Sequence, residues 1–306
     1  MDEGLNKKGI GKFSLLNTIK KSKIKTKFGI LTINNIYINP VLFEEYISEL
    51  VNDIKNLEFI FNQKIVDDYD KIVIIKRFIP SLSINNIEQY VKNEISKNHN
   101  FYSFLAEALL SIVLKDIYGY EITKSVVDVT STLCDSHTGA DVCMIDKENK
   151  IFILGEAKFY SSFSRGIQQI IKDFTGTKGF INKLESFYRT NCANRDAIKI
   201  FLKEINKSLY EEHTIHDFLK MKINFSGFVL HEHSGKTDKY FKKDFYDNLF
   251  ISVDDIEKNI SNLFELKLVN PDYSIDLFHI PINSKSELIV NIIRKALIIM
   301  DIKGGD

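Results

Sequence analysis

Several residue types and motifs are scarce or missing in this 306-residue chain, and each absence argues against a class of protein. There is no tryptophan, and there are only four prolines and three cysteines. Cys134, Cys143 and Cys192 form no CxxC pair and cannot all pair with one another, so neither a disulfide framework nor a structural zinc site is supported. We therefore expect a protein of a reducing compartment.

Targeting and nucleotide-binding signals are missing as well. The N-terminal residues lack the apolar segment of a secretory signal, and no apolar run is long enough for a membrane helix, so we expect a cytoplasmic protein without a membrane partner. There is no Gly-x-x-x-x-Gly-Lys-Ser/Thr motif. We therefore expect no nucleotide cofactor on this chain, and any ATP-driven step must belong to a partner.

Net charge is the third feature that is lacking. The chain has 41 Lys and Arg against 41 Asp and Glu, a formal net charge of zero. Long-range attraction to nucleic acid is then absent, and any phosphate-binding surface must be a local patch. With 44% hydrophobic and 27% charged residues the composition is globular. This balance suits a subunit that receives its substrate from a partner.

The most informative stretch runs from His137 to Tyr160, because charge intrudes there into strand-like apolar sequence. Two strands, 140–145 and 151–159, are predicted with a five-residue loop from Asp146 to Lys150 between them. If the hairpin closes symmetrically about Glu148, Asp141 lies opposite Gly155. Asp141 is then also a near neighbour of Glu156 across the two strands.

Alternation along the second strand places Glu156 and Lys158 on the face that also carries Phe152 and Leu154. Two carboxylates, Asp141 and Glu156, on a half-buried surface repel each other unless a cation lies between them. A divalent metal with oxygen ligands meets that need, and Lys158 can add a positive charge beside a metal-bound water or a phosphate oxygen. The alternative is an exposed strand end on which Glu156 and Lys158 only pair with each other.

A helix predicted from Phe101 to Tyr118 carries one further acidic residue of interest. Glu107 precedes Leu110 by three residues and Leu114 by seven, so it shares their apolar face. A partly buried carboxylate needs a partner. Either Glu107 contributes to a metal site, or it is a buried carboxylate that pairs with a lysine or a backbone amide.

Asp141, Glu156 and Lys158 together resemble the core motif of the PD-(D/E)xK nuclease superfamily, in which an acidic residue on one strand is followed by Glu-x-Lys on the next. The chain departs from that motif in having Ala140 where the superfamily has proline. The resemblance implies that Asp141, Glu156 and the Ala157 carbonyl hold Mg²⁺, or alternatively Mn²⁺. It further implies that Glu107 assists them.

A narrower resemblance covers roughly residues 101–281. The combination of Ala-Glu107-Ala, Gly-Ala-Asp141, Leu-Gly-Glu156-Ala-Lys158-Phe, a later Gly-Phe-Val-Leu strand and a terminal Phe-His-Ile-Pro-Ile is similar to the HamA family of Hachiman-type anti-phage systems, and to the related AbpA. In that family the nuclease subunit is encoded beside a superfamily-2 helicase, which restrains it until foreign or damaged DNA is sensed. The resemblance therefore implies DNA and a helicase as partners.

The rest of the chain predicts an α/β protein in two parts. Residues 1–26 are expected to be an irregular lead-in, followed by a strand from Phe28 to Ile38 and a helix after Pro40. Residues 1–95 form an N-terminal α/β extension in this interpretation. Residues 96–306 form a nuclease-like domain with a restriction-endonuclease-like core, that is, a mixed sheet flanked by helices. Its further predicted elements are a strand over 124–134, helices over 165–174, 177–188, 195–210 and 287–299, and strands over 222–233 and 273–281.

Nucleic-acid contacts are predicted on two segments. Family members place a Gln or Lys on the helix after Glu-x-Lys, and here Gln168 and Lys172 occupy such positions. Lys236 and Lys239 precede Tyr240 and Phe241, and two further lysines follow, which suits a basic rim with stacking rings, although an ordinary surface loop has the same composition. His231 and His233 have metal-ligand types, but no third ligand is near them in the sequence.

The leading hypothesis is a Mg²⁺-dependent deoxyribonuclease that acts as the effector of a defence complex. In it, Lys158 orients the attacking water and stabilises the phosphorane-like centre. The alternative is a non-catalytic DNA-binding or scaffold subunit that keeps the fold and serves a helicase.

Overall fold

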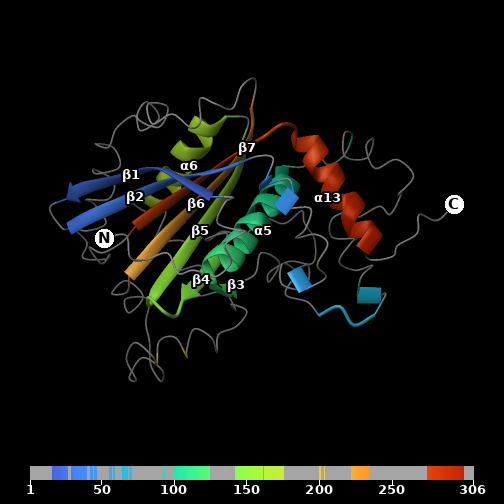
Figure 1. Ribbon diagram of the computed structural model, residues 1–306, viewed down its shortest axis with the longest axis horizontal. Helices are drawn as coiled ribbons and strands as arrows, with labels where there is room; N and C mark the ends of the chain where they lie inside the picture. The colour runs from blue at the N-terminus through green and yellow to red at the C-terminus, as the bar shows by residue number, and fades with distance from the viewer. Residues whose placement is uncertain are drawn as a thin grey trace.

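Figure 1 shows the computed structural model, in which one large sheet runs through the middle of the molecule. The structure describes residues 16–26, 29–39, 99–124, 142–160, 162–175, 222–233 and 274–299. It also describes shorter pieces of helix and loop between residues 42 and 70, and residues 93, 200 and 203.

The sheet has seven strands in the order β1-β2-β7-β6-β5-β4-β3. Strands β2, β7, β6 and β5 run parallel to one another. The pairs β1 with β2, β4 with β5 and β3 with β4 are antiparallel. The predicted α/β class with a mixed sheet is thereby confirmed. The bounds are β1 Leu16–Thr26, β2 Gly29–Ile38, β3 Glu121–Lys124, β4 Val142–Asp146, β5 Ile151–Tyr160, β6 Lys222–Glu232 and β7 Ser274–Ile282.

Helices cover both faces of this sheet (Figure 1). On one face α5, His99–Tyr118, and α13, Lys285–Ile299, share a buried apolar core with β4 to β7. On the other face lies α6, Phe163–Thr175, whose Ile170 packs against β6 at Gly227. A long crossover through a helix is what parallel neighbours such as β5 and β6 require. Among the described helices, none has the length and apolar character needed to cross a membrane.

The N-terminal lead-in predicted for residues 1–26 is wrong for its second half. Leu16–Thr26 is β1, which forms a hairpin with β2 through the two residues 27 and 28, with a bulge between Thr18 and Lys20. β2 in turn pairs with β7, so the sheet extends from the predicted nuclease-like region into the predicted N-terminal extension. Lysines are common on edge strands, where they discourage pairing with other chains. The lysine-rich sequence of β1 therefore concealed its strand character.

Most predicted elements of the second region are confirmed. α5, α6, β6, β7 and α13 each begin and end within two residues of the prediction. β3 begins at Glu121, ahead of the strand predicted over 124–134, and residues 125–141 lie outside the described part of the chain. The helices predicted over 177–188 and 195–210 fall almost wholly outside it.

The hairpin between β4 and β5 differs from the prediction by one residue. Its connection has four residues, 147–150, because Asp146 still pairs with Ile151. The Asp146 carboxylate accepts hydrogen bonds from the backbone and side-chain nitrogens of Asn149, at 3.0 and 2.7 Å, and Lys150 adopts a left-handed φ of 56°. An Asp that caps the turn in this way holds the chain in a tighter connection than the predicted five-residue loop. Consequently Val142, and not Asp141, lies opposite Gly155.

Candidate active site

β5 carries two of the predicted site residues, Glu156 and Lys158, on the face that α6 covers. Their register partners on β6 are Gly227 and Val229, both of which face α6 residues. Within the described part of the sheet, the last pair between β4 and β5 is Val142 with Gly155, and β5 pairs with β6 through Glu156 and Lys158. Glu156 therefore lies directly after the last described pair of β4 and β5.

Glu156 and Lys158 form an ion pair in the protein interior. Lys158 Nζ lies 3.1 Å from Glu156 Oε2, and the exposed fractions of the Lys158 and Glu156 side chains are 22% and 1%. A carboxylate that has lost its water needs a positive or hydrogen-bonding partner, which Lys158 supplies here. The pairing predicted in the alternative interpretation therefore exists, but the strand is not exposed at Glu156.

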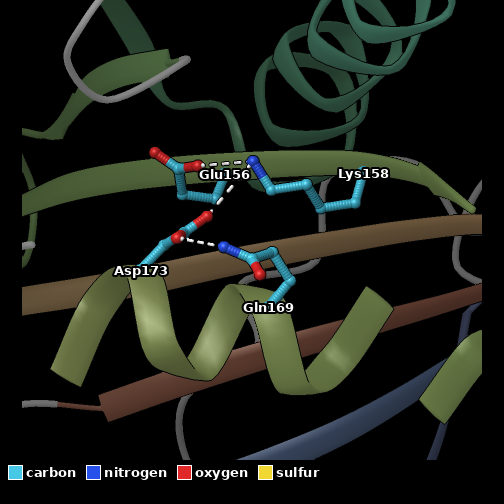
Figure 2. Close-up of polar contacts among 4 residues, drawn as sticks. All are labelled: Glu156, Lys158, Gln169 and Asp173. Carbon is cyan, nitrogen blue, oxygen red and sulfur yellow. Dashed lines mark hydrogen bonds and ion pairs between the residues drawn. The ribbon is translucent and has the colours of Figure 1, made fainter. Parts of the chain in front are cut away.

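A third charged residue, Asp173 on α6, completes the group (Figure 2). Its Oδ2 lies 3.2 Å from Lys158 Nζ, and its Oδ1 accepts a 2.7 Å hydrogen bond from Gln169 Nε2 one turn earlier on the helix. Lys158 is thus held between a strand carboxylate and a helix carboxylate. The sequence interpretation missed Asp173. The sequence offered one signal: Asp173 lies four residues after Gln169 and three after Ile170, so it shares the side of α6 that packs on the sheet.

Close packing sets the distance between α6 and the sheet. A Cβ placed on Gly166 would lie 2.5 Å from Val229 Cγ1, and a Cβ placed on Gly227 would lie 2.7 Å from Ile170 Cγ2. Each contact thus depends on one glycine, the first on the helix and the second on the strand. This close approach brings the C-terminal turn of α6 within ion-pair distance of Lys158.

The predicted metal site is only partly within the described residues. Asp141 lies outside them, directly before Val142, and so do Lys236 and Lys239. Among the described residues, no group of three or more His, Cys, Asp or Glu side chains could hold a metal ion. Of the ligands predicted on the hairpin, the structure therefore describes two: the buried Glu156 and, directly after it on β5, Ala157, which is 2% exposed.

Comparison with known proteins identifies the family. The HamA family model matches residues 15–296, which is nearly the whole chain. The chain belongs to the HamA family. HamA is a component of Hachiman anti-phage defence systems. A search of curated proteins found no match.

The HamA match does not assign roles to individual residues, so the remaining candidates rest on geometry. Glu107 is half-buried on α5, and Leu110, one turn later, would lie 2.8 Å from a Cβ on Gly155. α5 therefore covers the face opposite to the one that carries Glu156 and Lys158. Gln168 and Lys172 are both exposed on α6, as a nucleic-acid contact requires.

His231 and His233 make different side-chain contacts in this HamA fold. His231 Nε2 lies 2.6 Å from Nε2 of His279 on β7, and the two imidazoles stack beneath Phe163 at the start of α6. His233 instead contacts the side chain of Asn283 at 2.9 Å. The buried His231 and His279 pair thus anchors the first turn of α6, which makes it a packing feature at the other end of the helix from Asp173.

Proposed function

We propose that this HamA-family chain is a Mg²⁺-dependent deoxyribonuclease and that Glu156 and Lys158 are catalytic. The observation that carries the proposal is a fully buried carboxylate and its lysine partner, directly after the last described pair of β4 and β5. Burying such a pair gives little or no net stability compared with an apolar pair. A functional reason for the two charges is therefore the better explanation.

The oxygen donors at this position suit a hard divalent cation such as Mg²⁺, with Mn²⁺ as the alternative. In Figure 2 one oxygen of Glu156 is directed toward Lys158 while the other points away from it, on the side where a cation could bind. We assign Glu156 and the Ala157 carbonyl as ligands, with Asp141 as the second carboxylate. If the observed register continues by one residue beyond Val142 and Gly155, Asp141 faces Glu156.

A bound divalent cation would supply an acidified water and would neutralise charge on a phosphate. Lys158 stabilises the negative charge that develops on the phosphate oxygens during attack, because two carboxylates hold its ammonium in a partly buried position. Glu156 keeps the same ammonium from turning into solvent. Gln168 and Lys172, exposed on the neighbouring helix, are positioned to contact the nucleic-acid backbone.

Glu107 remains a proposed assisting residue. Glu107 is carried by α5, on the face of the sheet opposite to Glu156, so a mutation must decide whether it contributes. Glu107→Gln keeps volume and hydrogen bonding but removes charge. If Glu107 serves the metal, cleavage falls and the Mg²⁺ requirement rises while the melting temperature is kept. A large loss of melting temperature with unchanged metal dependence would instead make Glu107 a structural residue.

The nuclease assignment is tested with the purified full chain on plasmid and linear DNA. Wild type is expected to cut in Mg²⁺ or Mn²⁺ and to stop in EDTA. Glu156→Gln is expected to abolish cutting, and Lys158→Met to reduce it to a small residual rate. Glu148→Gln, on the exposed β4–β5 turn, is the matched control and should cut like wild type. Equal cutting by all variants, or none by wild type, would favour the non-catalytic DNA-binding or scaffold subunit.

We also propose a helicase partner encoded alongside, which restrains the nuclease until DNA is sensed. Support comes from the zero net charge and from the lack of a nucleotide-binding motif in a member of a defence-system family. Co-purification of the two gene products at low and moderate salt tests it. Recovery of the chain alone under both conditions would contradict the partnership.

A further inference from the structure

Lys158 is held by two acceptors that belong to different elements. Glu156 Oε2 on β5 lies 3.1 Å from its Nζ, and Asp173 Oδ2 on α6 lies 3.2 Å from it. A lysine side chain has a flexible four-carbon stem, so one ion pair leaves its ammonium able to swing about that contact. A second acceptor from another element fixes the ammonium position along a line between the two carboxylates.

Asp173 is itself held in place. Its other oxygen accepts a hydrogen bond of 2.7 Å from Gln169 Nε2, across one turn of α6. Its side chain is 21% exposed, close to the 22% of Lys158. A carboxylate on a helix surface that is simply hydrated by water does not need an amide donor from its own helix or a partly buried lysine as a partner. Figure 2 shows the four side chains as one chain of contacts from Gln169 to Glu156.

The helix that carries Asp173 is placed by close packing with the sheet. Gly166 packs on Val229, the register partner of Lys158, and Ile170 packs on Gly227, the register partner of Glu156. The two contacts align α6 with the same two rows of the sheet that carry the catalytic pair. Asp173 therefore reaches Lys158 from a helix whose distance to the sheet is fixed.

We propose that Asp173, held by Gln169, is a positioning residue for Lys158 in the cleavage reaction. This inference rests on the nuclease function proposed above. When Glu156 serves as a ligand to a divalent cation, its hold on Lys158 weakens, and Asp173 becomes the contact that keeps the ammonium at the phosphate. Without Asp173 the ammonium samples other orientations, and the chemical step slows while DNA binding is unchanged.

The activity test uses single-turnover cleavage by wild type, Asp173→Asn, Lys158→Ala and the double variant. Because a misplaced catalytic group typically costs one to two orders of magnitude in rate, Asp173→Asn should lower the cleavage rate about tenfold at unchanged DNA affinity. In the Lys158→Ala background the same change should have no further effect, since the group that Asp173 positions is gone. Asp116→Asn is the matched control, because Asp116 is a half-buried aspartate on α5 that accepts a hydrogen bond from Tyr46.

A second measurement separates this inference from the nuclease assignment. In thermal melting, the shifts caused by Lys158→Ala and Asp173→Asn should not add, because each variant removes the same contact. Additive shifts would overturn the inference whether or not the protein cuts DNA. So would an Asp173→Asn variant that cuts at the wild-type rate, or an Asp173 effect of equal size with and without Lys158. Failure of the nuclease assignment is seen in wild type alone, as an absence of cleavage.

Discussion

The contact between Gly166 on α6 and Val229 on β6 allows a quantitative test of how the helix is seated. Gly166→Ala adds one methyl group at 2.5 Å from Val229 Cγ1, far inside van der Waals contact. Val229 is fully buried in the central part of the sheet, so it has no room to yield. Forcing an extra carbon into such packing costs about 3 kcal/mol, the upper part of the usual range. Alanine is better than glycine in a helix by about 1 kcal/mol, which leaves a net loss of about 2 kcal/mol.

Val229→Ala is the complementary change. It removes two buried methyl groups, worth about 0.8 kcal/mol each, and leaves a cavity, for a total loss of about 2 to 3 kcal/mol. In the double variant the methyl group added at position 166 occupies part of the vacated space, and the atom that caused the overlap is gone. The gain in helix propensity then remains, so the double variant should lose only about 1 kcal/mol. Two independent changes would instead lose about 4 to 5 kcal/mol, since separate sites add.

Urea denaturation followed by circular dichroism measures these differences through the midpoint and slope. The chain has no tryptophan, so indole fluorescence cannot report unfolding. Arg165→Ala, at an exposed neighbouring position of α6, is the control and should change stability by no more than about 0.5 kcal/mol. A neutral Gly166→Ala, or losses that simply add in the double variant, would refute the close seating of α6. In that case the placement of Asp173 over Lys158 would lose its support.

Two further predictions concern the other face and the hairpin. Burial, followed by the charges of Asp276 and Asp146, raises the pKa of Tyr120. The Tyr120 hydroxyl in the unfolded chain therefore loses its proton first, at pH values above about 10, and stability falls as the pH rises from there. Tyr120→Phe should lessen the drop in melting temperature between about pH 8 and pH 11. An unchanged drop would contradict this prediction. Asp146→Ala removes both hydrogen bonds accepted from Asn149 and should lower the free energy of unfolding, measured in urea, by about 1 to 2 kcal/mol. A loss no larger than that of an exposed-site control would show that the turn does not depend on this cap.

The parts of the fold that were predicted correctly have strong local patterns. α5 and α6 show apolar residues at helical spacing over three or more turns, and β6 and β7 are largely apolar with a few buried polar residues, as expected of strands buried on both faces. The secondary structure of such segments can be predicted without reference to the rest of the chain. Strand order is different, because β2 pairs with β7, more than two hundred residues away in sequence. The sequence of neither strand alone predicts that β2 and β7 pair with each other.

The hairpin shows a failure of a different kind. Its two strands were recognised, but the loop was predicted to have five residues instead of four, and the capping role of Asp146 was missed. Because successive side chains of a strand point to opposite faces, one residue of register decides which face a side chain occupies. In the predicted register Asp141 shares a row with Gly155, which lies against Leu110 of α5. Val142 occupies that row in the structure, so the predicted register was inconsistent with a site on the α6 face.

The candidate site was predictable only where it lies within one element. Glu156 and Lys158 are two residues apart on one strand, so alternation alone places them together. Asp173 comes from a helix that crosses the sheet, and its contact with Lys158 depends on the crossing of α6 and on the absence of a side chain at Gly166 and Gly227. Those glycines do not reveal in the sequence that a helix and a strand approach there. A short motif therefore identifies the charged pair, while the packing of α6 decides which further carboxylate acts on it.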